Sequence, residues 1–281
     1  MLADRGEIMF KTIKESIKIT NENIVIATPL ILFSLLSTIY LIFSTGKSSI
    51  ATLFTIILFF LMLCAFLSGW FYMIMKAVKE PDIDKNTLIT ESFFSGVGEY
   101  FLSAIGMVFI LLFLSFGIFA LAVIAGKYFI GNPGVTYAQL SEAMATVESM
   151  KSLLTSLSPE QLLKINLWNS LMFFAMTLNY FIVMFYAPAM YFKKKNPFIA
   201  FFVSLKDIFS RKFFSNCGLY ILVTFGYFLL SILTTILNSN IFAHFVLTLL
   251  NFYFVSFCAV LIFNYYYSNF AKIGSKIDQT V

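Results

Sequence analysis

The sequence predicts an all-α membrane protein, a bundle of six transmembrane helices. Hydrophobic residues make up 60% of the 281 positions, and charged residues make up only 12%. A soluble domain is about half apolar and roughly a quarter charged. So few charged side chains could not cover the surface of a soluble protein of this length. The composition therefore places most of the chain in lipid.

Six long apolar blocks recur along the chain, and none of them contains Lys, Arg, Asp or Glu. They cover residues 24–43, 50–75, 101–125, 171–192, 218–237 and 244–267. A helix needs about 20 mostly apolar residues to cross a hydrocarbon core of about 30 Å. A transmembrane β-barrel would alternate apolar and polar residues, whereas segments 56–63 and 107–114 are apolar on every side. We therefore predict six spans within a single transmembrane domain, residues 1–281.

The distribution of basic residues predicts the orientation of the chain. Fifteen of the 19 Lys and Arg residues lie at the two termini and in the loops after the second and fourth spans. Only Lys47, Lys127, Lys151 and Lys164 lie on the opposite side. Short loops rich in Lys and Arg stay in the cytoplasm, so both termini are expected there. Basic residues that flank spans favour contact with lipid headgroups over nucleic acid as a partner.

A short amphipathic segment precedes each pair of spans. These segments cover residues 9–20, 86–100 and 197–214, and apolar residues recur in each at intervals of three and four. Such a segment forms a helix that lies in the membrane interface, with its apolar face toward the acyl chains. Asn196 and Pro197 are expected to start the third interfacial helix as its N-cap and first residue. The basic residues expected to contact headgroups are Lys11, Lys14, Lys18, Lys193, Lys194, Lys195, Arg211 and Lys212.

The only long polar stretch, residues 126–170, is predicted to be an insertion on the extracytoplasmic side. After a turn at Asn132, apolar residues from Leu140 to Leu157 step by three and four, which predicts one helix with a narrow apolar seam. The sequence 158–161, Ser-Pro-Glu-Gln, is typical of a capping box and predicts a second helix that continues into the fourth span. The insertion is interpreted either as a lid over an outer cavity or as a covering hairpin and docking surface.

Few residues carry recognisable chemistry. The sequence contains no metalloprotease, P-loop, dinucleotide-binding or serine-hydrolase motif, so no catalytic residue, metal ligand or cofactor is predicted. The three cysteines, Cys64, Cys217 and Cys258, form no C-x-x-C and are expected to be free. Polar residues within the spans, such as Ser231, Thr234 and Thr235, are expected to make interhelical hydrogen bonds. The candidate ligand contacts are Asn179, Tyr180 and Asn264.

The layout of the chain resembles a set of bacterial six-helix membrane families of unknown function. One of them is the membrane domain fused to some glycerophosphodiester phosphodiesterases. The resemblance rests on residues 69–79, on residues 187–197, and on the interfacial segment 198–214 that runs into a span. It implies a bacterial inner-membrane location and a link to lipid metabolism. It implies no catalytic residues. These 281 residues contain no phosphodiesterase domain, so that activity is not expected from the resemblance.

Three functions are compatible with these features. The leading hypothesis is a non-enzymatic protein that binds or moves lipids or other amphipathic small molecules. It follows from the interfacial helices, the aromatic spans and the absence of charge at membrane depth. The second is a scaffold or accessory subunit that docks a protein partner, or a second copy of the chain, through the outer hairpin. The third is an interfacial enzyme that uses Glu91, Glu99 or His244.

Overall fold

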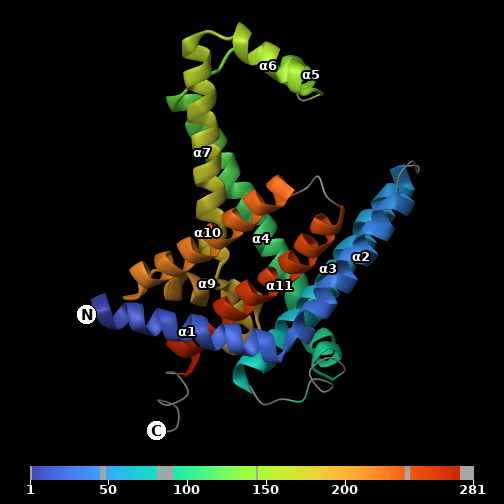
Figure 1. The fold of residues 1–281 in the computed structure, drawn as a ribbon, viewed down its shortest axis with the longest axis vertical. Coiled ribbons are helices and arrows are strands. Elements are labelled where there is room, and N and C mark those ends of the chain that lie inside the picture. The colour runs from blue at the N-terminus through green and yellow to red at the C-terminus, as the bar shows by residue number, and fades with distance from the viewer. Residues whose placement is uncertain are drawn as a thin grey trace. The chain divides into compact units, whose positions relative to one another are not determined.

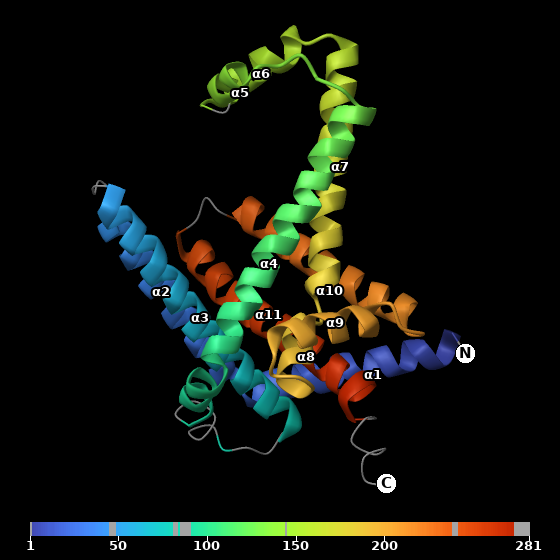
Figure 2. The ribbon, with the colours of Figure 1, turned by 180° about the vertical axis from the view of Figure 1, so that it is seen from behind.

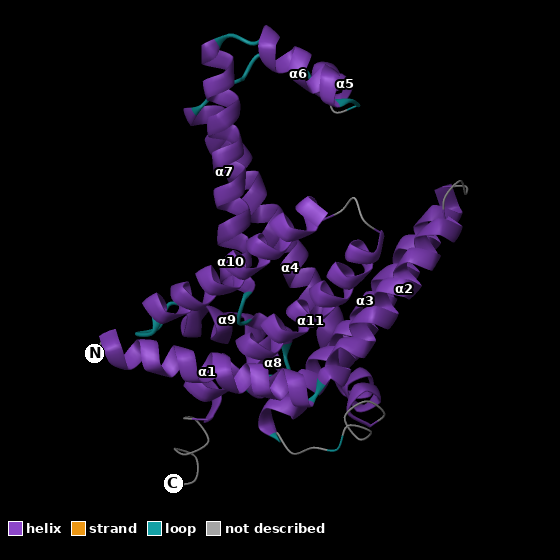
Figure 3. Cartoon of the chain, viewed as in Figure 1, coloured by secondary structure: helices purple, strands orange, loops and turns teal. Residues whose placement is uncertain are grey.

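The computed structural model describes residues 2–44, 49–80, 84, 91–143, 145–237 and 241–272. Within these ranges all regular structure is helical and no strand occurs, so the predicted all-α class is confirmed (Figure 3). The elements are α1 (Leu2–Glu22), η1 (Ile24–Ile26), α2 (Ala27–Ser44), α3 (Ser49–Lys79), α4 (Phe93–Phe129), α5 (Tyr137–Ala143), α6 (Val147–Ser156), α7 (Pro159–Val183), α8 (Tyr186–Phe192), α9 (Pro197–Ile208), α10 (Phe213–Leu237), α11 (Ile241–Tyr266) and the π-helical turn η3 (Tyr267–Ala271).

Six stretches of the described chain are helical, long and apolar enough to cross a membrane. They are Ile24–Ile42, Ala51–Lys79, Phe93–Phe129, Pro159–Phe192, Phe213–Leu237 and Phe242–Ala271. Each corresponds to one predicted span, so the prediction of a polytopic helix bundle is confirmed. Several of the helices are longer than the apolar block that predicted them. A helix needs no apolar side chain to continue into the interface, because its backbone hydrogen bonds are internal.

The chain forms two compact units. Unit 1 comprises Met1–Ile110 and Ile182–Val281, and unit 2 comprises Leu111–Phe181. Within unit 1, α1, α8 and η3 lie at one end, here called the α1 end (Figure 1). The last turns of α2 and α10 lie at the opposite end, and the view from behind agrees (Figure 2).

The buried core of unit 1 lies at the α1 end. Residues 73–75 of α3, residues 185–191 at the start of and within α8, and residues 260–266 of α11 contain most of its fully buried large side chains. Aromatic rings join these helices, since the rings of Phe71 and Phe263 stack at 5.6 Å. Toward the other end, α2, α10 and the first half of α11 mostly expose Leu, Ile and Phe side chains. Exposed apolar residues of this kind are suited to contact with acyl chains.

The N-terminal helix α1 buries a polar face and exposes an apolar one. Thr12, Ser16 and Thr20 are buried, and Ser16 and Thr20 donate hydrogen bonds to backbone carbonyls one turn earlier. The predicted apolar stripe points outward instead, with Phe10 70% and Ile17 42% exposed. An exposed apolar stripe beside a row of lysines is the surface expected of an interfacial helix.

Local signals set the ends of α8 and α9. The side chain of Asn196 accepts hydrogen bonds from the backbone N–H groups of Phe198 and Ile199, with Pro197 next to it, so the predicted start of α9 is confirmed. The fourth span is interrupted between α7 and α8, at residues 184 and 185. Pro188 explains the interruption, because it has no N–H to donate to the carbonyl of residue 184.

Two predicted boundaries were wrong. The second interfacial segment is not a separate helix, since its residues 93–100 form the start of the continuous helix α4 and residues 86–90 lie outside the described ranges. The predicted single seam helix is divided into α5 and α6. Thr146 causes the division, because its side chain accepts a hydrogen bond from the backbone N–H of Ser149 and starts a new helix. Periodicity alone does not detect such a cap.

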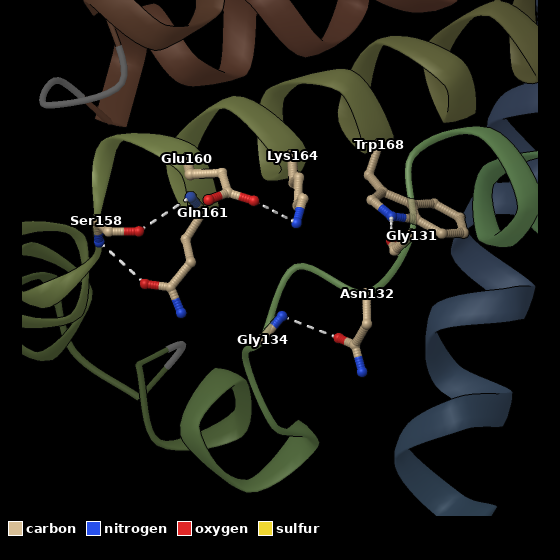
Figure 4. A network of polar contacts seen from close by, with 8 residues as sticks. All are labelled: Gly131, Asn132, Gly134, Ser158, Glu160, Gln161, Lys164 and Trp168. Atoms are coloured by element: carbon tan, nitrogen blue, oxygen red, sulfur yellow. Dashed lines mark hydrogen bonds and ion pairs between the residues drawn. The ribbon is translucent and has the colours of Figure 1, made fainter.

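In unit 2 the helix α7 begins at the predicted capping box (Figure 4). The N–H of Ser158 donates to Oε1 of Gln161 at 2.9 Å, and the N–H of Gln161 donates to Oγ of Ser158 at 3.3 Å. Trp168 of α7 donates from Nε1 to the carbonyl of Gly131 at 2.9 Å. Gly131 and the neighbouring Gly134 have φ angles of 78° and 75°, which favour glycine. These contacts tie the turn after α4 to α7.

The close approach of α3 and α4 gives a test of the packing in unit 1. A Cβ atom at Gly96 would lie 2.9 Å from the carbonyl oxygen of Ser68 and would clash with Cβ of Tyr72. Because neither atom is the end of a flexible side chain, we expect Gly96→Ala to lower the free energy of unfolding by about 1–3 kcal/mol. Gly98→Ala is the matched control, since nothing lies within 4 Å of its Cβ position. Thermal unfolding of both variants in detergent measures the difference, and equal melting temperatures would contradict this packing.

Candidate functional site

The predicted ligand contacts Asn179 and Tyr180 lie near the end of unit 2. Asn179 is 9% exposed. Its Nδ2 donates to Oγ of Ser115 at 3.0 Å, and that hydroxyl lies 3.3 Å from Oδ1 of Asn179. Asn179 therefore makes the interhelical hydrogen bond that is the usual role of a polar residue in a span. Tyr180 is 57% exposed.

The third predicted contact, Asn264, lies in unit 1 and fastens α1 to α11. Its Nδ2 donates to Oγ of Ser16 at 3.1 Å and reaches the carbonyl of Thr12 at 3.5 Å. At the other end of the same pair of helices, the hydroxyl of Tyr253 donates to Oδ1 of Asn21 at 2.5 Å. Asn264 is 5% exposed, and its amide N–H groups bond to α1 within the protein.

The basic residues predicted to contact headgroups fall into two groups. Lys193 and Lys212 are engaged within unit 1, since they belong to the cluster described next. The exposed members are Lys11, Lys14, Lys18, Lys194, Lys195 and Arg211. Lys195 pairs with Glu99 at 3.5 Å, and its side chain remains 52% exposed. Lys18 pairs with Glu22 one turn later at 3.7 Å. The exposed members are the ones positioned to reach a phosphate outside the protein.

A polar cluster around Asp207 joins α8, α9, α10 and α11 at the α1 end. Nζ of Lys193 lies 2.8 Å from Oδ2 of Asp207, and the two side chains are 25% and 13% exposed. The hydroxyl of Tyr266 donates to the same carboxylate oxygen at 2.6 Å. The buried amide of Asn216 donates to the carbonyls of Asp207 and Ile208 and accepts from Tyr265 at 3.1 Å. The Asp207 cluster thus supplies hydrogen-bond donors to the last carbonyls of α9. It also joins the last turn of α11 to α9 and α10.

Lys212 extends this cluster to η3. Its Nζ donates to Oδ1 of Asn269 at 2.7 Å and lies 5.7 Å from the ring centre of Phe270. Nζ of Lys193 lies at the same distance from that ring. Burial lowers the pKa of the Lys212 ammonium, because low-dielectric surroundings disfavour the charged form. These two lysines therefore bind the π-helical turn η3 to the rest of unit 1 through Asn269 and Phe270.

A pocket lies between α10 and α11, away from the α1 end. It has a volume of about 330 Å³ and is lined by Tyr227, Leu230, Ser231, Thr234, Thr235 and Asn251. Five of these six residues carry a hydroxyl or an amide, whereas the other exposed side chains of both helices are mostly Leu, Ile, Val and Phe. Near it, a Cβ atom at Gly226 would lie 2.7 Å from Cζ of Phe254. The missing side chain of Gly226 therefore allows α10 and α11 to approach closely beside the pocket.

The hydrogen bonds of the pocket residues are only partly made. Oγ1 of Thr234 donates to the carbonyl of Leu230 at 2.9 Å, and Oγ1 of Thr235 donates to the carbonyl of Ser231 at 3.0 Å. The side chains of Tyr227, Ser231 and Asn251 make no hydrogen bond with any other described residue. In hydrocarbon an unpaired polar group costs several kcal/mol. The pocket is therefore suited to a ligand that supplies polar partners.

Sequence reasoning identified part of this pocket. The sequence predicts that Ser231, Thr234 and Thr235 of the fifth span make interhelical hydrogen bonds. For the two threonines this is wrong, because their hydroxyls donate to carbonyls of α10 itself. Tyr227 and Asn251 were not singled out. The available signal was the spacing 227, 231, 234, 235, which places four hydroxyls on one face of a helix. The facing Asn251 could not be paired with them without knowing how α10 and α11 are aligned.

The residues that the enzyme hypothesis requires, Glu91, Glu99 and His244, form no common site in the described part of the chain. Glu99 is paired with Lys195, and Glu91 and His244 are exposed. No group of three or more His, Cys, Asp or Glu residues that could hold a metal ion occurs among the described residues. Cys64, Cys217 and Cys258 are free.

The six long apolar helices define the class of this chain, a multipass membrane protein. Comparison with models of known families, with curated proteins and with solved structures finds no match. The resemblance to the bacterial six-helix families stays a prediction.

The Asp207 cluster can be tested by removing its charge. Asp207→Asn leaves the ammonium of Lys193 without its counter-ion, and we expect a loss of about 2 kcal/mol in the free energy of unfolding. Glu80→Gln is the matched control, because its carboxylate pairs with Lys76 at 3.2 Å on an exposed surface. Exposed pairs contribute about 0–1 kcal/mol. Thermal unfolding in detergent measures both variants, and a change for Asp207→Asn no larger than that for Glu80→Gln would refute the role of the cluster.

Proposed function

We propose that this multipass membrane protein binds or moves lipids or other amphipathic small molecules without catalysing a reaction on them. The observation that carries the proposal is the pocket between α10 and α11. Its polar lining residues stand within helices whose other exposed side chains are mostly apolar and suit contact with acyl chains. A ligand that carries both a polar group and an apolar tail matches both surfaces, because each part then meets groups of its own kind.

The α1 end supports the same proposal from the membrane interface. In α1 and α9 apolar side chains point outward, with Phe10 70%, Phe198 64% and Phe202 67% exposed. The exposed basic residues beside them are placed to meet anionic headgroups, each contributing about 1 kcal/mol near a charged membrane surface. We propose that these faces rest in the cytoplasmic leaflet of a bacterial inner membrane, with both termini in the cytoplasm.

Lipid analysis tests the proposed function directly. Native mass spectrometry of the full chain, released from gentle detergent, should find a chemically defined lipid bound in a fixed ratio. Ser231→Phe places a ring in the pocket and should reduce the bound lipid about tenfold, which corresponds to about 1.4 kcal/mol. Thr38→Phe is the matched control, because Thr38 is also an exposed residue with a hydroxyl and does not line the pocket. Its Oγ1 donates to the carbonyl of Ser34 at 2.9 Å.

Two results would argue against lipid binding. If the wild-type chain carries no lipid, the proposal fails. If it retains a protein instead, the scaffold function gains support, and deleting residues 136–157 should then release that partner. These residues include α5 and α6 of unit 2.

The proposed orientation has its own test. We expect Lys194→Cys, on an exposed residue beside α8, to react with a membrane-impermeant maleimide only after the cells are opened. Ser156→Cys, at the end of α6, should react in cells whose inner membrane is intact, because the basic loops lie on the other side. The three native cysteines are replaced by serine or alanine in both variants. The reverse labelling pattern would show that the proposed orientation is wrong and that the basic loops lie outside the cytoplasm.

A further inference from the structure

We infer that the pocket between α10 and α11 takes the uncharged polar group of a neutral lipid, such as the hydroxyl and ester groups of a diacylglycerol, and discriminates against lipids that carry a phosphate. This inference rests on the proposed function and names the class of ligand for the same site. Three features carry it: the donors and acceptors of the lining, the absence of charge around them, and their depth in the helices.

The lining offers both hydrogen-bond donors and acceptors. The side-chain amide of Asn251 has two N–H donors and one carbonyl acceptor, and the hydroxyls of Tyr227 and Ser231 can do either. Thr234 and Thr235 have already given their protons to backbone carbonyls, so toward the pocket they can only accept. A ligand with a hydroxyl and carbonyl oxygens offers both a donor and acceptors to this lining. A fully ionised phosphate only accepts and offers no donor to either threonine.

No charge is available near the pocket along these two helices. Neither α10 nor α11 contains a Lys, Arg, Asp or Glu, from Phe213 to Leu237 and from Ile241 to Tyr266. An ionised group transferred from water without a counter-charge pays a desolvation cost that neutral hydrogen bonds do not offset. Headgroups with phosphates are therefore expected to bind poorly here.

The depth of the pocket favours the same class of ligand. Asn251 lies ten residues after the first residue of α11 and fifteen before its last. At 1.5 Å per residue these positions are about 15 Å and about 22 Å along the helix axis. The middle of a hydrocarbon core of about 30 Å lies at a comparable distance from its edges. A phosphate remains at the edge of that core, whereas a diacylglycerol can bring its glycerol group deeper.

The size of the pocket limits how much of the ligand enters it. About 330 Å³ is near the lower end of the volumes typical of small-molecule sites. The glycerol and ester groups fit a space of this size, and the two acyl chains do not. The exposed apolar side chains of α10, among them Phe228 and Ile232, would lie beside the chains. The pocket thus binds the polar part of the ligand, while the acyl chains remain in the surrounding lipid.

The test compares two lipids that differ only by a phosphate. The purified full chain is placed in nanodiscs of phosphatidylcholine that contain either dioleoylglycerol or dioleoyl phosphatidate, and bound lipid is counted by native mass spectrometry. We expect the occupancy by dioleoylglycerol to exceed that by the phosphatidate at least about tenfold. Asn251→Leu should reduce the binding of dioleoylglycerol about fivefold or more, because it removes three hydrogen-bonding positions. Asn169→Leu is the matched control, on an exposed asparagine of α7.

Each outcome has a distinct meaning. Preferred binding of dioleoylglycerol that is lost in Asn251→Leu and kept in Asn169→Leu supports the inference. Equal or tighter binding of the phosphatidate, or a preference that Asn251→Leu leaves unchanged, overturns the inference and leaves lipid binding itself intact. A chain that binds neither lipid and carries none from the cell overturns the proposed function as well. If Asn251→Leu does not give a folded monodisperse protein, Ser231→Ala takes its place, since it removes a hydroxyl without adding volume.

Discussion

The aromatic packing at the α1 end is the constraint on which unit 1 depends. Lipid tails are as apolar as Leu or Phe side chains, so the hydrophobic effect does not hold transmembrane helices together. Close packing and interhelical hydrogen bonds must do this. Tyr191 shows both, because its ring stacks on Tyr100 at 4.4 Å and its hydroxyl donates to the carbonyl of Ser68 at 3.1 Å. Contacts of this kind join α3, α4 and α8 where the core is densest.

This concentration of contacts explains why the pocket lies where it does. Away from that end, α10 and α11 approach each other closely at Gly226 but expose most of their side chains to the surroundings. The polar face of α10 can then remain open without the neighbouring helices filling it. The internal lysines and the Asp207 cluster keep the opposite end closed. Thus α10 and α11 are closely packed at the α1 end and mostly exposed at the opposite end.

The fold followed from the sequence to a large extent, and the site only in part. Blocks free of charge located all six spans because a single ionised residue in hydrocarbon is costly enough to be excluded. The helix starts at Asn196 and Ser158 were also predictable, because their side chains are typical helix caps. The division of α5 from α6 at Thr146 was missed, since a threonine cap looks like any polar residue on a helix. The pocket depends on which turns of α10 and α11 face each other, and no local pattern specifies this alignment.

The buried polar face of α1 has a consequence for how the chain is made. Ser16 receives its hydrogen bond from Asn264, 248 residues later in the sequence. At about 5–20 residues per second, ribosomes need on the order of 10–50 seconds to supply that partner. During this interval Ser16 and Asn21 lack the side chains that meet them in the finished fold. The helix α1 is synthesised well before α11 and must wait for it, so a chain that stops before α11 leaves the polar face of α1 without this partner.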